Sequence, residues 1–409
     1  MTQDRRQFLR HCVLTAGTML ALEGQTPKRI LIRPAAGATF RRRLAERELL
    51  RGLAGLFPAT EARISDAAAT DGDLAIALRV DDAGLTNPEA YEIHYENGQA
   101  LLRGSGEQAL LYAVFEFLER QGAFFGIDGV SYPIDPSQQA VVPAMGQPWK
   151  ASPRFSTRGL LPWPDFLNCI TVYNEEDFRA YFESMLRMRF NTFGMHVYTG
   201  ANQWAESYLS FEYAGVGHLS FLDNSASHRW GYLPERTSRF TMGGAQFFDG
   251  EVFGSDATRL ARDPWEQAAR ARSLLRAGFD HAARLGIRTG IGFEPYQIPD
   301  EILRALPPEV KTDQKPGPRF DIESRTAKDM LEVRLAQLLE AYPQVDYVWL
   351  WEDEDMNWES RKTGIPLSVT PFQQAHDFLK RNAPDKRLVL AGWGGVARHF
   401  EHLHRSLPG

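Results

Sequence analysis

The stretch YVWLWEDEDMNWES, residues 347–360, runs five hydrophobic residues directly into four consecutive carboxylates. A short apolar run of this kind is typical of a buried β-strand, here with acids at its carboxyl end. Carboxylates removed from water are costly unless hydrogen bonds or opposite charges offset the loss of hydration. The stretch therefore indicates either a solvated acidic loop that follows a strand, or a strand end where carboxyl groups perform chemistry.

Apolar strands alternate with amphipathic helices on both sides of this stretch, which predicts a parallel sheet with its chemistry at the carboxyl ends. The predicted strands are 154–163, 191–198, 287–295, 345–353 and 387–393. The predicted helices are 175–190, 264–286, 325–342, 370–383 and 396–406, and a long loop covers 198–262. A (β/α)8 TIM barrel needs eight strand-helix units. We therefore predict an incomplete barrel of about five units in a domain spanning 151–409.

A small α+β domain is predicted ahead of the barrel, over residues 25–140. Its period-2 and helical patterns predict strand 28–34, helix 40–57, strand 73–80, a hairpin over 91–107 and helix 108–123. The hairpin turns at Asn97-Gly98, a pair that suits a tight two-residue turn. The fold class is thus α/β, with an α+β N-terminal domain followed by a barrel.

Charge and cysteine content exclude several classes of protein. The 409 residues carry a formal net charge of -6, with a pI near 6.0, so no basic surface for nucleic acid is expected. The two cysteines are Cys12 and Cys169, which rules out a thiolate metal cluster. We expect no cofactor and no metal, and the oligomeric state stays open.

The first 24 residues are typical of a removable export signal. Arg5-Arg6 precede Phe8-Leu9 and then an apolar run from Cys12 to Leu22, an order that is similar to a twin-arginine signal. The run is shorter than the ~20 residues that a membrane-spanning helix needs, so no membrane-spanning segment is expected. The pattern predicts a periplasmic or secreted protein.

The segment over 91–122 resembles the small α+β domain that precedes the catalytic barrel in family 20 hexosaminidases and family 67 α-glucuronidases. The matching positions are Tyr91, Ile93, Gly104, Gly106, Tyr112, Phe117 and Leu118. The predicted domain that carries this resemblance, residues 25–140, makes up about a quarter of the chain. The resemblance implies that a sugar-cleaving barrel follows, with a carbohydrate as substrate.

Within the acidic stretch, Asp353-Glu354 resembles the adjacent Asp-Glu pair of family 20 enzymes. The resemblance implies that Glu354 is the general acid and that Asp353 orients the substrate or intermediate. Trp351 and Glu352 stand where that family has glycines, and Glu352 is a second candidate for the acid. Glycosidic cleavage needs one protonated carboxyl and a second group that stabilises positive charge, and neighbouring acids among tryptophans supply both.

Other candidate substrate-binding residues follow or open the predicted strands. They are Arg158, His196, Tyr198, Glu294, Trp351 and Trp393, with Tyr296 beside Glu294. Arg158 resembles the sugar-hydroxyl-binding arginine that opens the family 20 barrel, and its alternative is a structural ion pair. Arg158 and the other side chains are expected to converge at the carboxyl ends of the strands, and the alternative for the others is packing in the core.

Two other functions stay open. The barrel segment could be a noncatalytic saccharide-binding or scaffold module. The sequence GWGGVA, residues 392–397, matches a dinucleotide-binding pattern and leaves a nucleotide-binding oxidoreductase as a third candidate. A calcium loop starting at Asp353 fails because Trp358 replaces the required glycine, and the histidines over 399–404 are interpreted as part of a surface helix.

Overall fold

The computed structural model describes residues 27–96, 99–133, 148–162, 170, 173–197, 212–213, 217–218, 255–262, 264–298, 300–312, 320–353, 369–392 and 404–405. The chain divides into two compact units. Met1–Ser156 with Arg187–Arg189 forms the first, and Thr157–Leu186 with Phe190–Gly409 forms the second. The predicted signal over residues 1–24 lies outside the described residues. Within them, no helix is long and apolar enough to cross a membrane.

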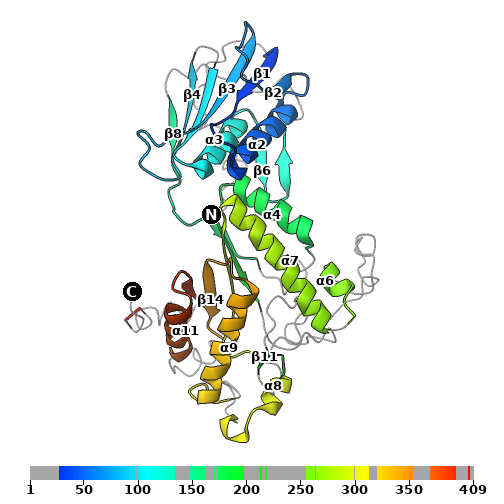
Figure 1. Cartoon of the computed structure of the whole chain (residues 1–409), viewed down its shortest axis with the longest axis vertical. Coiled ribbons are helices and arrows are strands. Elements are labelled where there is room, and N and C mark those ends of the chain that lie inside the picture. The colour runs from blue at the N-terminus through cyan, green and yellow to red at the C-terminus, as the bar shows by residue number, and fades with distance from the viewer. Residues whose placement is uncertain are drawn as a thin grey trace, which may run out of the picture. The chain divides into compact units, whose positions relative to one another are not determined.

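The first unit is a mixed sheet covered by two helices (Figure 1). The strands lie in the order β2-β1-β3-β5-β4-β8. Their bounds are β1 Arg29–Arg33, β2 Glu61–Ile64, β3 Asp73–Val80, β4 Tyr91–Glu96, β5 Gln99–Gly104 and β8 Trp149–Ala151. Helices α2 (Phe40–Leu56) and α3 (Glu107–Arg120) pack against each other, and their apolar stripes form the core with the sheet. A small hairpin joins β6 (Phe124–Gly126) to β7 (Gly129–Ser131).

The sequence predicted β1, β3, β4, β5 and both helices of this unit, and the structure confirms them. It did not predict β2, whose side chains are mostly exposed and lack an apolar alternation. The segment over 135–153 was interpreted as a linker or a crossing strand, and the structure shows β8 there, paired with β4 in the first sheet. The predicted start of the barrel domain at Ala151 therefore falls inside the first unit.

The second unit is built on a parallel sheet whose strands are ordered as they occur in the chain. They are β9 Gly159–Leu160, β10 Thr192–His196, β13 Arg288–Phe293, β14 Tyr347–Trp351 and β15 Arg387–Ala391. All four pairings are parallel, in the order β15-β14-β13-β10-β9. A doubly wound sheet reverses its strand order at a switch point, whereas this sheet winds in one direction as a TIM barrel does. The fold class predicted from the sequence is confirmed: within the described residues, five parallel strands wind in one direction as in a TIM barrel.

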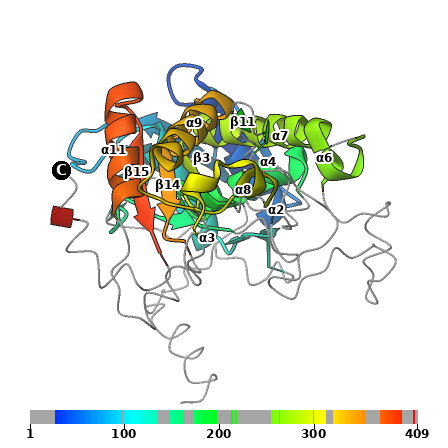
Figure 2. The same cartoon turned by 90° about the horizontal axis from the view of Figure 1, so that it is seen from below.

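Four helices connect these strands. They are α4 Glu175–Arg187, α7 Pro264–Leu285, α9 Arg325–Ala341 and α11 Thr370–Asn382. Figure 2 shows α9 and α11 next to β14 and β15. The shorter elements are α6 Asp256–Arg259, α8 Asp300–Ala305, the 3-10 turn Pro308–Val310, and the paired strands β11 Glu212–Tyr213 and β12 Gly217–His218. Of the fifth predicted helix, only 404–405 lies within the described residues.

One face of the parallel sheet packs against the helices. Phe193 on β10 contacts Phe182 of α4 and Phe279 of α7, with ring centroids 5.0 and 6.0 Å apart. On β13, the ring of Phe293 lies 4.0 Å below the guanidinium carbon of Arg334 from α9. Because strand side chains alternate between faces, the residues next to Phe193 and Phe293 point to the opposite face.

That opposite face combines glycines with two tryptophans. Trp349 and Trp351 of β14 stack on each other with centroids 5.2 Å apart. A Cβ added at Gly194 of β10 would lie 2.8 Å from the Trp349 ring, and one added at Gly290 of β13 would overlap its indole nitrogen. The glycines therefore make room for Trp349 across the neighbouring strands. In a closed barrel this is the face that lines the interior.

We predict that Gly290→Ala destabilises the second unit by at least about 3 kcal/mol, because the new methyl group overlaps the indole of Trp349. Gly278→Ala in α7 is the matched control: its Cβ would meet Phe178 at 3.3 Å, and a helical alanine offsets that tight contact. Urea unfolding followed by tryptophan fluorescence measures both, since eight of the nine tryptophans lie in the second unit. Equal stability of the two variants would contradict the packing described.

Candidate active site

The carboxyl ends of three neighbouring strands carry polar side chains that have little or no exposed surface. His196 is the last residue of β10, Glu294 follows β13, and Glu352 and Asp353 follow β14. His196 and Glu294 are 0% exposed, Glu352 is 3% exposed and Asp353 is 8% exposed. Since β10, β13 and β14 are adjacent and parallel, these side chains lie at one edge of the sheet. His196 and Glu294 thus lie together at the carboxyl ends, as one of the two alternatives expected, and both are fully buried. Substrate binding by either residue stays a prediction.

Glu294 is held between an imidazole and an amide. Its Oε1 lies 3.4 Å from Nε2 of His196, and its Oε2 accepts a hydrogen bond of 2.6 Å from Nε2 of Gln297. Gln297 reaches this position because the chain turns after β13, where its backbone N–H donates to the Glu294 carbonyl at 3.4 Å. The amide thus donates a hydrogen bond to Oε2, and the imidazole lies close to Oε1. A fully buried carboxyl group needs polar neighbours of this kind to offset its lost hydration.

The imidazole of His196 is also fixed by an aromatic ring. The edge of one ring meets the face of the other in the pair His196 and Trp351, with centroids 4.6 Å apart. Trp351 in turn stacks on Trp349. Trp351 was predicted as a substrate-binding residue. It is only 3% exposed and packs against His196 in this structure, so substrate binding by Trp351 stays a prediction.

Glu352 and Asp353 differ in the face that they occupy. The Glu352 backbone N–H donates to the Ala391 carbonyl at 2.9 Å, which extends the β14–β15 ladder one residue beyond Trp351. Alternation then places Glu352 on the helix-facing side with Leu350, and it returns Asp353 to the side of Trp351. Asp353 is therefore on the face of His196 and Glu294. By register, its Cα lies about 8 Å from that of Glu294.

An arginine from helix α9 supports the turn that carries Glu294. Nη1 of Arg334 donates to the Pro295 carbonyl at 2.6 Å, and Nη2 donates to the Glu294 carbonyl at 3.4 Å. Arg334 is 1% exposed, and burial lowers its pKa to about 9. Neither Arg334 nor Gln297 was predicted from the sequence. The sequence did contain a sign of the buried Arg334: this charged residue stands between Leu331 and Leu338 on the apolar stripe of α9.

The remaining predicted residues are not part of the described cluster. Glu354, Tyr198 and Trp393 lie outside the described residues, so their roles stay predictions. Tyr296 packs against Phe320, with centroids 6.3 Å apart, in a small cavity on the helix side of the sheet.

Arg158 was expected at the carboxyl ends with the other site residues, but its backbone lies at the amino ends. Its carbonyl accepts from the Asn191 and Thr192 N–H groups, and its N–H donates to Asn191 Oδ1 at 3.0 Å. That position is about 16 Å along β10 from His196, because each strand residue rises ~3.3 Å. The expected position is thus wrong as far as the backbone is concerned: β9 pairs with β10 from Gly159 onward, so Arg158 precedes the paired residues. Sugar binding by Arg158 stays a prediction.

The described residues contain no group of three or more His, Cys, Asp or Glu side chains arranged to hold a metal ion. The chemistry that the described cluster can perform is that of carboxyl groups and an imidazole: proton transfer, hydrogen bonding to hydroxyls and stabilisation of positive charge. Its closed, aromatic surroundings strengthen each of these electrostatic effects, because little water competes.

Comparison with known proteins finds no matching family model and no matching curated protein. Similar solved structures include a β-hexosaminidase of Streptomyces plicatus, with 14% identity over 90% of this chain and a TM-score of 0.48. A chitobiase of Flavobacterium johnsoniae shares 13% identity over 91% of the chain, with a TM-score of 0.49. A family 138 glycoside hydrolase that targets the pectin rhamnogalacturonan II shares 13% identity over 86%, with a TM-score of 0.47.

The chain spans only part of these proteins: 62% of the hexosaminidase, 50% of the chitobiase and 34% of the pectin-targeting enzyme. The chain is thus similar to glycoside hydrolases of known structure at 12–15% identity.

We predict that His196→Ala destabilises the second unit by about 3 kcal/mol or more, because it leaves the Glu294 carboxylate buried without its imidazole and opens a cavity beside Trp351. The control is His376→Ala, since His376 contacts Asp377 at the surface, where such a pair contributes at most about 0.5 kcal/mol. Urea unfolding measures both. Similar losses for the two variants would show that the His196–Glu294 contact does not stabilise the fold.

Proposed function

We propose that the chain is an exported glycoside hydrolase that cleaves a glycosidic bond in an oligo- or polysaccharide by carboxyl general-acid catalysis. One observation carries the proposal: Glu294, Asp353 and His196 gather on one face at the carboxyl ends of adjacent parallel strands, next to Trp351. In barrel enzymes this end of the strands holds the catalytic residues. Glycosidic cleavage uses a pair of carboxyl groups beside the scissile bond, and Asp353 and Glu294 supply carboxyl groups on this face.

The residues are assigned different roles. Glu354 is the proposed acid, which protonates the departing oxygen, and Asp353 orients the substrate or the intermediate. The pair of Glu294 and His196 forms the floor of the site, where its charge stabilises the positive charge that develops on the sugar. Glu352 is the weaker candidate for the acid, because alternation places it on the helix-facing side.

We predict that wild-type protein releases phenols from at least one aryl glycoside in a panel of sugars, and that Glu354→Gln slows this release in a leaving-group-dependent way. Loss of the acid costs about 10³-fold in kcat when the leaving group is a poor one such as phenol, because it must be protonated. The loss is much smaller for 2,4-dinitrophenol, which leaves without protonation. Asp353→Asn is expected to lose activity to the same extent with both leaving groups.

Glu352→Gln is the matched control for this test, with an expected loss of less than about tenfold for either leaving group. If Glu352→Gln instead shows the leaving-group dependence and Glu354→Gln does not, the two acids exchange roles. Saccharide binding without turnover of any glycoside by wild-type protein would reject the hydrolase in favour of a noncatalytic binding module.

Export is the second part of the proposal, and it is supported by the Arg5-Arg6 pair ahead of a short apolar run. We predict that changing both residues to lysine retains the protein in the cytoplasm, because the twin-arginine pathway reads the guanidinium pair itself. Arg10→Lys, outside the pair, is the control and is expected to be exported. Cell fractionation measures both, and normal export of the double variant would contradict a twin-arginine signal.

A further inference from the structure

We propose that Arg334 is a positioning residue for the candidate site: by holding the backbone carbonyls of Glu294 and Pro295, it keeps the Glu294 carboxylate against His196 and Gln297. The inference rests on the proposed function only in the role given to Glu294. The contacts that carry it belong to the second unit and come from two elements, helix α9 and the turn after β13.

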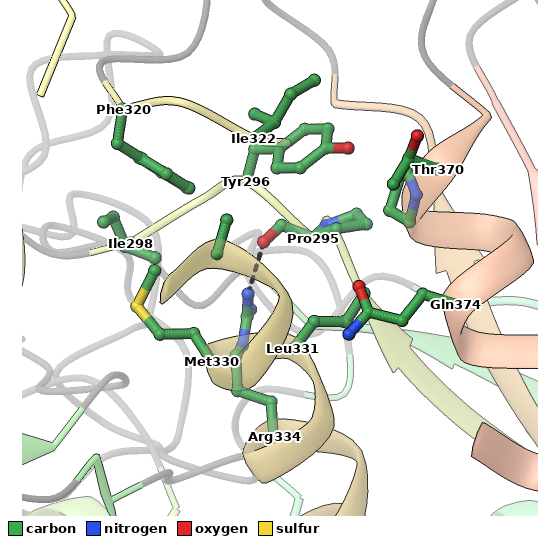
Figure 3. Close-up of a pocket in the computed structure, with 12 residues that line it drawn as sticks. Pro295, Tyr296, Ile298, Phe320, Ile322, Met330, Leu331, Arg334, Thr370 and Gln374 are labelled. Atoms are coloured by element: carbon green, nitrogen blue, oxygen red, sulfur yellow. Dashed lines mark hydrogen bonds between the residues drawn. The ribbon is translucent and has the colours of Figure 1, made fainter. Parts of the chain in front are cut away.

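The geometry makes Arg334 a bridge between the helix layer and the site. Figure 3 shows its guanidinium extending from α9 to the Pro295 carbonyl, beside a cavity of about 10 Å³. The same group stacks over Phe293, the last residue of β13, at 4.0 Å. Arg334 thus contacts three consecutive residues of which the middle one is Glu294. It acts from the helix-facing side, whereas the Glu294 carboxylate points to the opposite side, toward His196.

A bidentate clamp on two carbonyls fixes the direction in which the chain leaves the strand. The guanidinium is a rigid planar fork, so two donors to consecutive carbonyls restrict both peptide planes. The orientation of those planes determines the direction of the Glu294 side chain. It also determines the position of Gln297, three residues later, whose amide donates to Glu294 Oε2 at 2.6 Å. Loss of the clamp therefore displaces the carboxylate relative to His196 without removing any atom from the site.

The burial of Arg334 argues that its role is more than stabilisation. Its folded pKa lies well below the ordinary value because the guanidinium is desolvated. The folded state then holds that proton less tightly than the unfolded chain, so at neutral pH the buried charge opposes folding. An apolar residue would suit this position on the stripe of α9 better for stability alone. An arginine is useful here because its long, planar fork places two donors on consecutive carbonyls of the turn at Glu294.

The test compares Arg334→Met with Arg276→Met in the full chain. Methionine keeps the apolar stem of the side chain and removes the donors. Arg276 of α7 offers a matched clamp, since its guanidinium donates to the carbonyls of Ala341 at 2.8 and 2.6 Å and of Glu340 at 3.0 Å. That clamp holds the carboxyl end of α9, away from the carboxyl ends of the strands. Arg334→Lys, which retains the charge with a less rigid donor, is the conservative variant.

The first readout is the NMR signal of the His196 imidazole in protein labelled at histidine, assigned by its absence in His196→Gln. The signal in Arg334→Met is expected to move toward its position in Glu294→Gln, where the carboxylate charge is absent. Arg276→Met should keep the wild-type signal, and Arg334→Lys should lie between the two. An unchanged His196 signal in folded Arg334→Met would overturn the inference, whether or not the protein hydrolyses glycosides.

The second readout is kinetic and uses the aryl glycoside that the wild-type protein turns over. Arg334→Met is expected to lose about 10- to 100-fold in kcat with little change in KM, since small displacements of a catalytic group cost this much. Arg276→Met should stay within about twofold of wild type. If no glycoside is turned over, the proposed function fails while the NMR result still decides the role of Arg334. If Arg334→Met does not fold, Arg334→Lys carries both readouts.

Discussion

The burial of one carboxylate constrains the rest of the second unit. Glu294 has no exposed surface, and its two oxygens face His196 and the Gln297 amide. A carboxyl group in that position needs polar neighbours that are held in place, because burial removes its hydration. The ring of Trp351 fixes His196, and the turn after β13 fixes Gln297. The aromatic contact and the turn therefore hold the two side chains that lie against the Glu294 carboxyl group.

The two faces of the parallel sheet have separate roles. On the helix-facing side, Phe193 packs against α4 and α7 and supplies apolar burial. On the other side, Gly194 and Gly290 carry no side chain, so the indole of Trp349 lies across them. This division explains how one short strand contributes both to the core and to the site. Arg334 connects the two sides through the backbone carbonyls at the end of β13.

Much of this arrangement could be predicted from the sequence, because it depends on local patterns. Apolar runs followed by helical periodicity located the parallel strands, and their ends located His196, Glu294 and Asp353. These patterns do not contain the pairing register of the strands or the contacts made between separate elements. Arg158 was expected with the others, but the pairing of β9 with β10 places its backbone at the amino ends. Gln297 and Arg334 act through a turn and a helix contact that no sequence period encodes.

The most direct test of the site is a crystal structure of Glu354→Gln bound to a saccharide that the wild-type protein cleaves. The account predicts a sugar ring at the carboxyl ends of β10, β13 and β14, hydrogen-bonded to Asp353 and lying above the Glu294–His196 pair. A saccharide bound only to the first unit, or on the helix-facing side of β14, would contradict it.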